Sequence, residues 1–161
     1  GELYATSEKL EGVMSLLSHP PAPVSPWTRL RARSLRSIRY DRPLQERVAV
    51  GTAYLIERRK YHMPGPHIVL ETVAVRPELQ GRGFGSGLIR HALARADAEQ
   101  LPLYLDTFAL RSAEMYSRFG FCVLEEGRIS GMDSPVYLMA RQPRDLPPEI
   151  HTSVNWNPLI D

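Results

Sequence analysis

Four glycines fall within the eight residues 80–87, which read Gln-Gly-Arg-Gly-Phe-Gly-Ser-Gly. An extended apolar run, Ile68 to Val75, precedes this segment, and an amphipathic run, Leu88 to Ala98, follows it. The segment therefore joins a predicted strand to a predicted helix and leaves backbone N–H groups with few side chains in front of them. Such amides favour a phosphate or pyrophosphate, because they donate hydrogen bonds and the helix dipole attracts negative charge. The segment thus predicts a nucleotide-like ligand.

The two elements on either side of this segment have the clearest periodicity in the chain. Residues 67–75 alternate between two faces, as a strand does, and Pro77 ends the run. The helix after the glycines has one continuous apolar stripe at helical spacing. Its members are Gly85, Leu88, Ile89, Ala92, Leu93 and Ala96.

Weaker patterns predict the other elements. Helices are predicted at residues 2–18, 27–38 and 111–119, the last ended by Gly120 in the C′ position. Strands are predicted at residues 48–57, 101–108, 121–124 and 136–140. Prolines predict a loop at residues 19–27 and a turn at residues 61–66, and the tail after Arg141 is predicted to be irregular.

Composition indicates one ordinary soluble domain. The chain has 161 residues, 43% of them hydrophobic and 24% charged, which is enough to bury a core. A net charge of +2 does not favour nucleic acid, and the six arginines within residues 29–42 form either a solvated face or an anion-recognition surface. The sequence has no run of about 18 apolar residues that would predict a membrane span, and no secretory signal is visible. The single cysteine, Cys122, is expected to be buried and fits the reducing cytoplasm.

Three phosphate-binding patterns compete for the glycine segment. A P-loop requires a lysine, and neither the segment nor the helix after it contains one. A dinucleotide fold requires Gly-x-Gly-x-x-Gly, but Ser86 stands at the third glycine position counted from Gly81, although Asp106 mimics the ribose-binding acid. The third pattern is Gln80-x-x-Gly83-x-Gly85.

This third pattern resembles the signature of the GCN5-related N-acetyltransferase superfamily, Arg/Gln-x-x-Gly-x-Gly/Ala between a strand and a helix. Residues 71–77 are similar to the strand before that signature, and residues 116–121 resemble the Tyr-x-x-x-Gly-Phe element after the next strand. Residues 105–107, 116–121 and 139–141 are most similar to puromycin-acetyltransferase-like bacterial members. The resemblance covers residues 48–141, with no convincing strand before Val48, where the family usually begins with one. The asparagine usual after the strand at 103–107 is also not evident.

The resemblance implies an α+β (α/β) fold, with a central mixed, mostly antiparallel sheet flanked by helices and a splayed pair of strands that holds acetyl-CoA. Within a single domain we expect an N-terminal helical segment on the acceptor side (1–46). An acetyl-CoA-binding catalytic core (47–141) and an irregular C-terminal tail (142–161) would follow.

The resemblance also implies the cofactor contacts. The amides of residues 81–86 would bind the pyrophosphate of acetyl-CoA, and the backbone of residues 73–75 would pair with the pantetheine arm. The expected cofactor-binding residues are Val73, Ala74, Val75, Gln80, Gly81, Arg82, Gly83, Phe84, Gly85 and Ser86.

Two side chains are candidate catalytic groups. Tyr116 would protonate the departing thiolate, since a phenol is protonated at neutral pH; the alternative is a packed tyrosine with a satisfied hydroxyl. Glu71 would remove a proton from the acceptor ammonium, directly or through water; the alternative is a satisfied strand carboxylate. The histidines have no metal-ligand spacing, so no metal site is predicted.

The predicted function is an acetyl-CoA-dependent N-acetyltransferase in which a primary amine, on an unidentified small-molecule acceptor, attacks the thioester directly. One alternative is a non-catalytic CoA-binding sensor or assembly domain of the same fold, and another is a nicotinamide-dependent enzyme. Neither nucleic acid nor membrane is a predicted partner, and the chain is expected to be a monomer or a homodimer.

Overall fold

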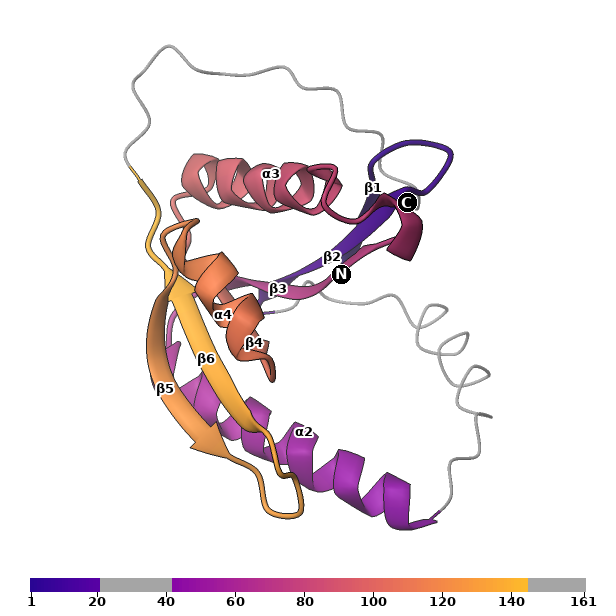
Figure 1. Cartoon of the computed structure of the whole chain (residues 1–161). Coiled ribbons are helices and arrows are strands. Elements are labelled where there is room, and N and C mark those ends of the chain that lie inside the picture. Colours follow the sequence, from indigo (N-terminus) through magenta and orange to yellow (C-terminus); the bar gives the residue numbers. More distant parts are fainter. Residues whose placement is uncertain (21–41, 145–161) are drawn as a thin grey trace, which may run out of the picture.

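A computed structural model describes residues 1–20 and 42–144. Six strands form one sheet in the order β1-β2-β3-β4-β6-β5 (Figure 1). The strands are β1 (Glu2–Ala5), β2 (Gly12–His19), β3 (His67–Val75), β4 (Leu103–Thr107), β5 (Cys122–Arg128) and β6 (Pro135–Arg141). The helices are α2 (Arg42–His62), the short 3-10 helix η2 (Pro77–Leu79), α3 (Phe84–Ala98) and α4 (Leu110–Ser117).

The sheet is mixed and mostly antiparallel, as predicted. β3 and β4 pair in parallel, and the other four neighbouring pairs are antiparallel. A dinucleotide fold requires an open, mostly parallel sheet. The nicotinamide-dependent reading of the glycine segment is therefore wrong.

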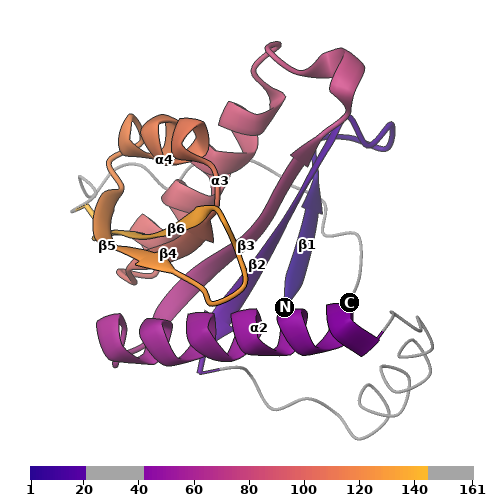
Figure 2. The same cartoon turned by 60° about the horizontal axis from the view of Figure 1, so that its bottom comes forward.

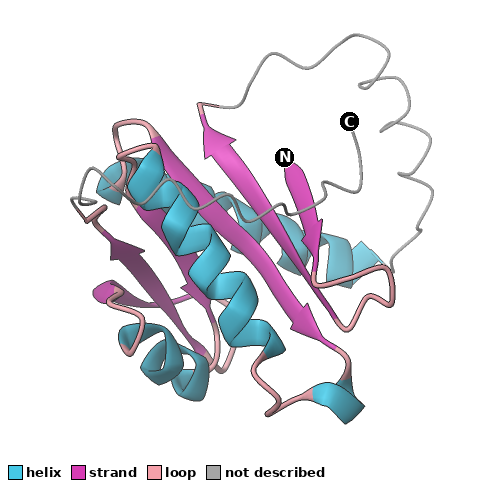
Figure 3. Ribbon diagram, turned by 90° about the horizontal axis from the view of Figure 1, so that it is seen from above, coloured by secondary structure: helices cyan, strands magenta, loops and turns pink. Residues whose placement is uncertain are grey.

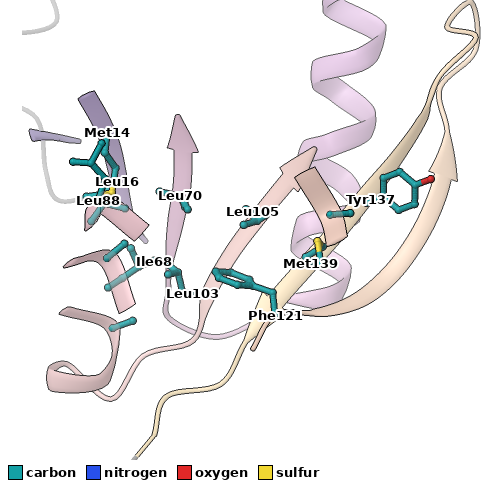
Figure 4. Packing of buried hydrophobic residues seen from close by; sticks show 13 residues of the cluster. Met14, Leu16, Ile68, Leu70, Leu88, Leu103, Leu105, Phe121, Tyr137 and Met139 are labelled. Carbon is teal, nitrogen blue, oxygen red and sulfur yellow. The ribbon is translucent and has the colours of Figure 1, made fainter. Parts of the chain in front are cut away.

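Two apolar clusters lie on opposite faces of this sheet. The first joins α3 and α4 to strand residues such as Ile68, Leu70 and Leu103 (Figure 4). The second lies under α2 and includes Val69 and Tyr104. Figure 3 shows α3 lying over the strands, and Figure 2 shows α2 on the opposite side. Adjacent strand residues thus serve different layers, because side chains alternate across a strand.

The predicted helix at residues 2–18 is wrong, because these residues form the β1–β2 hairpin. Within β2, Gly12, Met14 and Leu16 are buried while their neighbours are half-buried, which is a period of two. The apolar residues of this segment also fit a helical stripe, and pairing of β2 with both β1 and β3 decides between the two. The N-terminal part of the chain therefore supplies strands to the sheet.

The predicted strand at residues 48–57 is also wrong, because it lies within helix α2. Its β-branched residues favoured a strand. The side chains that face the sheet instead recur at helical spacing, with Tyr54 and Leu55 packed on the second cluster and Arg58 and His62 bonded to β5. The helix predicted at 27–38 and most of the predicted tail lie outside the described residues.

The remaining elements confirm the predictions to within a few residues. Gly120 has φ +90°, and its amide bonds to the Ser117 carbonyl at 3.0 Å while the Phe121 amide bonds to the Tyr116 carbonyl at 3.3 Å. These two bonds form a Schellman motif with Gly120 at C′. Cys122, however, is exposed rather than buried, because it opens edge strand β5.

Within the described ranges, no helix combines the length and the apolar character that crossing a bilayer requires. The same residues contain no group of three or more histidine, cysteine, aspartate or glutamate side chains placed to hold a metal ion.

Candidate functional site at the splayed strands

The centre of the candidate site is the point where β3 and β4 separate. Their ladder has two residue pairs, Ile68 with Leu103 and Val69 with Tyr104. Beyond these pairs β4 continues beside β6, and β3 continues beside β2. Figure 4 shows Leu70 and Leu105 on the diverging strands. Residues 70–75 of β3 therefore keep one ladder partner and leave the edge towards β4 open.

A β-bulge at Glu71 decides which backbone groups face this opening. On β2, Leu16 pairs with Leu70 and the next residue, Ser15, pairs with Thr72, so Glu71 is the extra residue. Before the bulge, the Ile68 amide donates to the Pro102 carbonyl on the β4 side at 2.9 Å.

After the bulge, the alternation of backbone groups is reversed. The Arg76 amide donates to the Glu11 carbonyl on the β2 side at 2.9 Å. The Ala74 carbonyl also faces β2, close to Gly12. Because successive residues alternate, Val73 and Val75 direct their backbone N–H and C=O groups into the opening. Of the three predicted pantetheine contacts, these two are thus placed to pair with an extended ligand, and Ala74 belongs to the β2 ladder.

The glycine segment turns the chain from the end of β3 into α3. Gly81 and Gly83 have φ values of +76° and +90°, a region that glycine enters without steric cost. Gly83 is the N-cap of α3, and no side chain caps the helix there. Added Cβ atoms at Gly81 and Gly83 would meet no atom of the described residues within 4 Å, so these residues leave the surface in front of this backbone open.

Two contacts hold the glycine segment against β3. The Gln80 side-chain amide donates to the Val75 carbonyl at 3.2 Å. An added Cβ at Gly85 would lie 3.5 Å from the Val75 side chain, so the first turn of α3 packs closely on the strand. The first amides of α3 are therefore positioned beside the open edge of β3, as the sequence predicts for a pyrophosphate site.

Tyr116 lies near the C-terminal end of α4 and packs against the first apolar cluster. Its ring meets Phe121 edge-on with 5.6 Å between centroids. Burial raises the pKa of the Tyr116 phenol above its ordinary value, so the proton is retained at neutral pH. Within the described parts of the chain, no hydrogen bond to its hydroxyl is formed, which leaves the group free to donate.

Glu71 is exposed and lies at the bulge, where the opening begins. A second carboxyl group, Asp106, lies across the opening at the end of β4. Burial raises the pKa of Asp106; the Arg59 charge lowers it and the Glu71 charge raises it, and the net shift is upward. From the sequence, Asp106 was a candidate only as a mimic of a ribose-binding acid, because its position opposite Glu71 depends on strand pairing.

Helix α2 is fixed over this face by Glu125 of β5. Its carboxylate accepts hydrogen bonds from the Arg58 guanidinium at 2.8 Å and from the Tyr54 hydroxyl at 3.1 Å, and it contacts His62 at 2.6 Å. The Arg58 hydrogen bonds lower the pKa of Glu125 to about 2, which outweighs its partial burial. Helix α2 is therefore held on the sheet by an ionised network.

His67 is buried at the other end of β3 and does not reach the opening. Its Nδ1 atom lies 2.7 Å from the Gly65 carbonyl oxygen, and its ring stacks on His19. Burial lowers its pKa, so the ring is neutral at pH 7. These contacts indicate a structural histidine.

A family model described as Acetyltransferase (GNAT) family matches residues 15–121, more than half of the chain. The match begins within β2, upstream of the resemblance that the sequence motifs suggested. The chain belongs to the GNAT acetyltransferase family.

Solved structures agree with this assignment. A Corynebacterium glutamicum protein described as histone acetyltransferase HPA2 and related acetyltransferase has 26% identity and a TM-score of 0.53. The match covers 91% of this chain and 66% of that protein, so this chain spans about two thirds of its length.

Two further structures share the fold at lower identity. An agmatine N-acetyltransferase mutant has 12% identity and a TM-score of 0.60, with 88% of this chain and 76% of that chain covered. Arylalkylamine N-acetyltransferase 2 from Aedes aegypti has 12% identity and a TM-score of 0.56, with 88% and 72% covered.

Proposed function

We propose that this chain is an acetyl-CoA-dependent N-acetyltransferase that acetylates a primary amine of a small molecule. The observation on which this depends is the edge of β3 past Leu70, which has no ladder partner on the β4 side within the described ranges and leads through η2 into the glycine segment. An edge strand pairs with an extended ligand through its backbone. The pantetheine arm would pair with Val73 and Val75, and the amides of residues 81–86 would bind the pyrophosphate.

In the proposed reaction, Glu71 removes a proton from the acceptor ammonium, directly or through water. The free amine attacks the thioester carbonyl, a C–N bond forms, and the C–S bond then breaks. A β3 amide in the opening stabilises the oxyanion of the tetrahedral intermediate, which is typically worth about 2.7–4 kcal/mol for one donor. Tyr116 gives its proton to the departing thiolate, and the second proton that the nitrogen loses restores the Tyr116 phenol through water.

The proposed acid and base approach the opening from different layers. Tyr116 packs with the α3–α4 layer. Glu71 lies two residues beyond Val69, which packs in the α2 layer. Thioester and acceptor would meet between them at the splay. The finer resemblance to puromycin-acetyltransferase-like members, the cytoplasmic location and the monomeric or dimeric state stay predictions.

Binding and turnover test this proposal together. Calorimetry should detect acetyl-CoA and no NAD, and CoA release should be followed with agmatine and tryptamine, amines of the kinds that the names of the solved structures mention. Acetyl-CoA binding without release of CoA with any amine would favour the alternative, a sensor or assembly domain. Absence of acetyl-CoA binding by folded protein would contradict both.

Replacing Tyr116 by phenylalanine should lower kcat by roughly 10²–10⁴-fold, the usual contribution of a general acid. The dissociation constant of acetyl-CoA should not change, because the hydroxyl acts on the leaving thiolate. Steady-state kinetics and calorimetry check the two parts. Tyr61→Phe, at an exposed position of α2, is the matched control and should leave both values unchanged.

A further inference from the structure

The register between β3 and β4 places two carboxyl side chains at the point where these strands separate, one on each strand. Val69 and Tyr104 form the last ladder pair, and both pack in the cluster under α2. Two residues further along β3 and β4 come Glu71 and Asp106. Because side chains alternate across a strand, Asp106 projects from the same face of the sheet as Tyr104. Glu71 lies two residues beyond Val69, at the bulge, and so starts from that same face. The pair therefore faces the α2 layer.

A buried hydroxyl and one cation accompany this carboxyl pair. Tyr104 is 0% exposed, and among the described residues its hydroxyl has no hydrogen-bond partner. The buried Nε atom of Arg59, on α2, also has none there. The charges of Arg59 and Glu71 act on the Asp106 carboxyl, and those of Asp106, Arg59 and Glu125 act on the Tyr104 hydroxyl.

Glu125 is already engaged by α2, whereas Asp106 forms no ion pair or hydrogen bond within the part of the chain that the structure describes. A buried hydroxyl without a partner is costly, and native proteins usually satisfy such groups. The unpartnered Tyr104 hydroxyl beside Asp106 therefore points to a polar ligand on this face, next to the place where a thioester would lie.

We propose that Asp106 belongs to the acceptor site, where with Glu71 it binds the acceptor amine as an ammonium ion on the α2 face of the splay. The inference rests on the proposed function and names its substrate class: a primary amine without a carboxylate beside the reacting nitrogen. Two carboxylates at one mouth attract a cation and repel an anion, and Arg59 offsets one of the two charges. The Tyr104 hydroxyl supplies a further hydrogen bond to the ligand.

The proton balance follows from this arrangement. The bound ammonium gives one proton to the carboxyl pair and becomes a neutral amine. The lone pair of this amine forms the C–N bond, the C–S bond breaks, and Tyr116 protonates the thiolate. The nitrogen then loses its second proton, which restores the Tyr116 phenol through water, and the proton on the carboxyl pair returns to solvent after product leaves.

Matched amines test the substrate class. Agmatine and tryptamine differ from arginine and tryptophan by the absence of the carboxylate next to the reacting nitrogen. Wild-type protein should prefer the decarboxylated member of each pair by roughly tenfold or more in kcat/KM, since like-charge contacts of about 1.4 kcal/mol correspond to that ratio. Equal rates, a preference for the amino acids, or no turnover of any of the four by protein that binds acetyl-CoA would overturn the substrate class.

Asp106→Asn tests the residue. It should lower kcat/KM for agmatine and tryptamine by about 10–100-fold and narrow the preference over the amino acids, while acetyl-CoA affinity is retained. Asp133→Asn, which removes an exposed negative charge from the β5–β6 loop, is the control.

The retained acetyl-CoA affinity of Asp106→Asn shows that the variant is folded. Unchanged kcat/KM and an unchanged preference for the amines over the amino acids would overturn the role of Asp106 and leave the acetyltransferase proposal intact. Failure of the wild-type protein to bind acetyl-CoA would instead reject the proposed function itself, so the two failures are distinguishable.

Discussion

At the scale of single residues, the glycine segment works through backbone conformation. Gly83 has φ +90° and ψ −7° at the N-cap of α3, and an added Cβ would meet no neighbouring atom. Glycine is therefore required at position 83 by the backbone dihedral angles and not by lack of space, because a residue with a Cβ in the left-handed region costs about 1–2 kcal/mol. Any substitution that moves this residue out of that region also redirects the amides that follow it.

Gly83→Ala should weaken acetyl-CoA binding about tenfold, since a loss near 1.4 kcal/mol corresponds to that factor. Calorimetry with acetyl-CoA measures the effect. Gly131→Ala is the matched control, because Gly131 has φ +78°, equally open surroundings and a place in the β5–β6 turn. Both variants should lose a similar free energy of unfolding, and equal losses of acetyl-CoA affinity would contradict the proposed phosphate site.

At the scale of elements, α2 reaches the sheet by a close approach to β5. Gly127 is buried, and a Cβ added there would overlap the Tyr54 hydroxyl. That hydroxyl is held in place by its bond to Glu125, which also binds Arg58 and His62. The absence of a side chain at Gly127 thus allows α2 to lie over the face on which we place the acceptor.

Gly127→Ala should lower the free energy of unfolding by about 1–3 kcal/mol, the usual cost of overpacking. Tyr54→Phe removes the overlapping hydroxyl and should cost about 1 kcal/mol alone. The double variant should lose less than the sum of the two, and urea unfolding of all four proteins measures the coupling. Strict additivity would show that the hydroxyl does not limit the approach of α2.

At the scale of the whole molecule, a buried ion pair ties the end of α3 to the end of β6. Arg141 donates two hydrogen bonds to the Asp97 carboxylate at 2.8 and 2.9 Å, and the Arg144 amide donates a third at 2.8 Å. Burial acts to raise the pKa of Asp97, but the hydrogen bonds from Arg141 outweigh it and hold the pKa below its ordinary value. The pair joins the end of α3, which packs mainly on β2 and β3, to β6, which lies beyond β4 in the sheet.

Asp97→Asn should lower the free energy of unfolding at pH 7 by about 3–5 kcal/mol, because it leaves a buried guanidinium without its counter-charge. A depressed carboxyl pKa stabilises the fold above the unfolded value, near 3.9, and this contribution is lost as pH falls through the folded pKa. The variant should therefore lose part of the acid dependence of stability below about pH 4, while other carboxyl groups with a lowered pKa, Glu125 among them, keep their contributions.

Urea unfolding at several pH values measures the Asp97 contribution. Glu78→Gln, which breaks an exposed ion pair with Arg76, should cost at most about 1 kcal/mol and is the control. Equal losses from the two substitutions would contradict a special role for the buried pair.

Local chemistry was sufficient to predict the part of the site that one continuous segment builds. The alternation of residues 67–75, the glycines that follow and the stripe of α3 are properties of neighbouring residues, so β3, the turn and α3 were predicted correctly. The C′ position of Gly120 was found for the same reason. Tyr116 and Glu71 became candidates through motif order, and their roles stay predictions.

Pairing between distant segments decided the rest. Residues 2–18 and 48–57 contain apolar residues compatible with either periodicity, and only the partners available in the folded sheet made the first a hairpin and the second a helix. The same dependence explains why the sequence did not indicate the role that we propose for Asp106. That role rests on its position opposite Glu71, just beyond a ladder that ends after two pairs. Sequence by itself determined the glycine turn, because dihedral freedom is local. The tertiary structure alone decided the face on which we place the acceptor, because strand register and the bulge are set by contacts between remote parts of the chain.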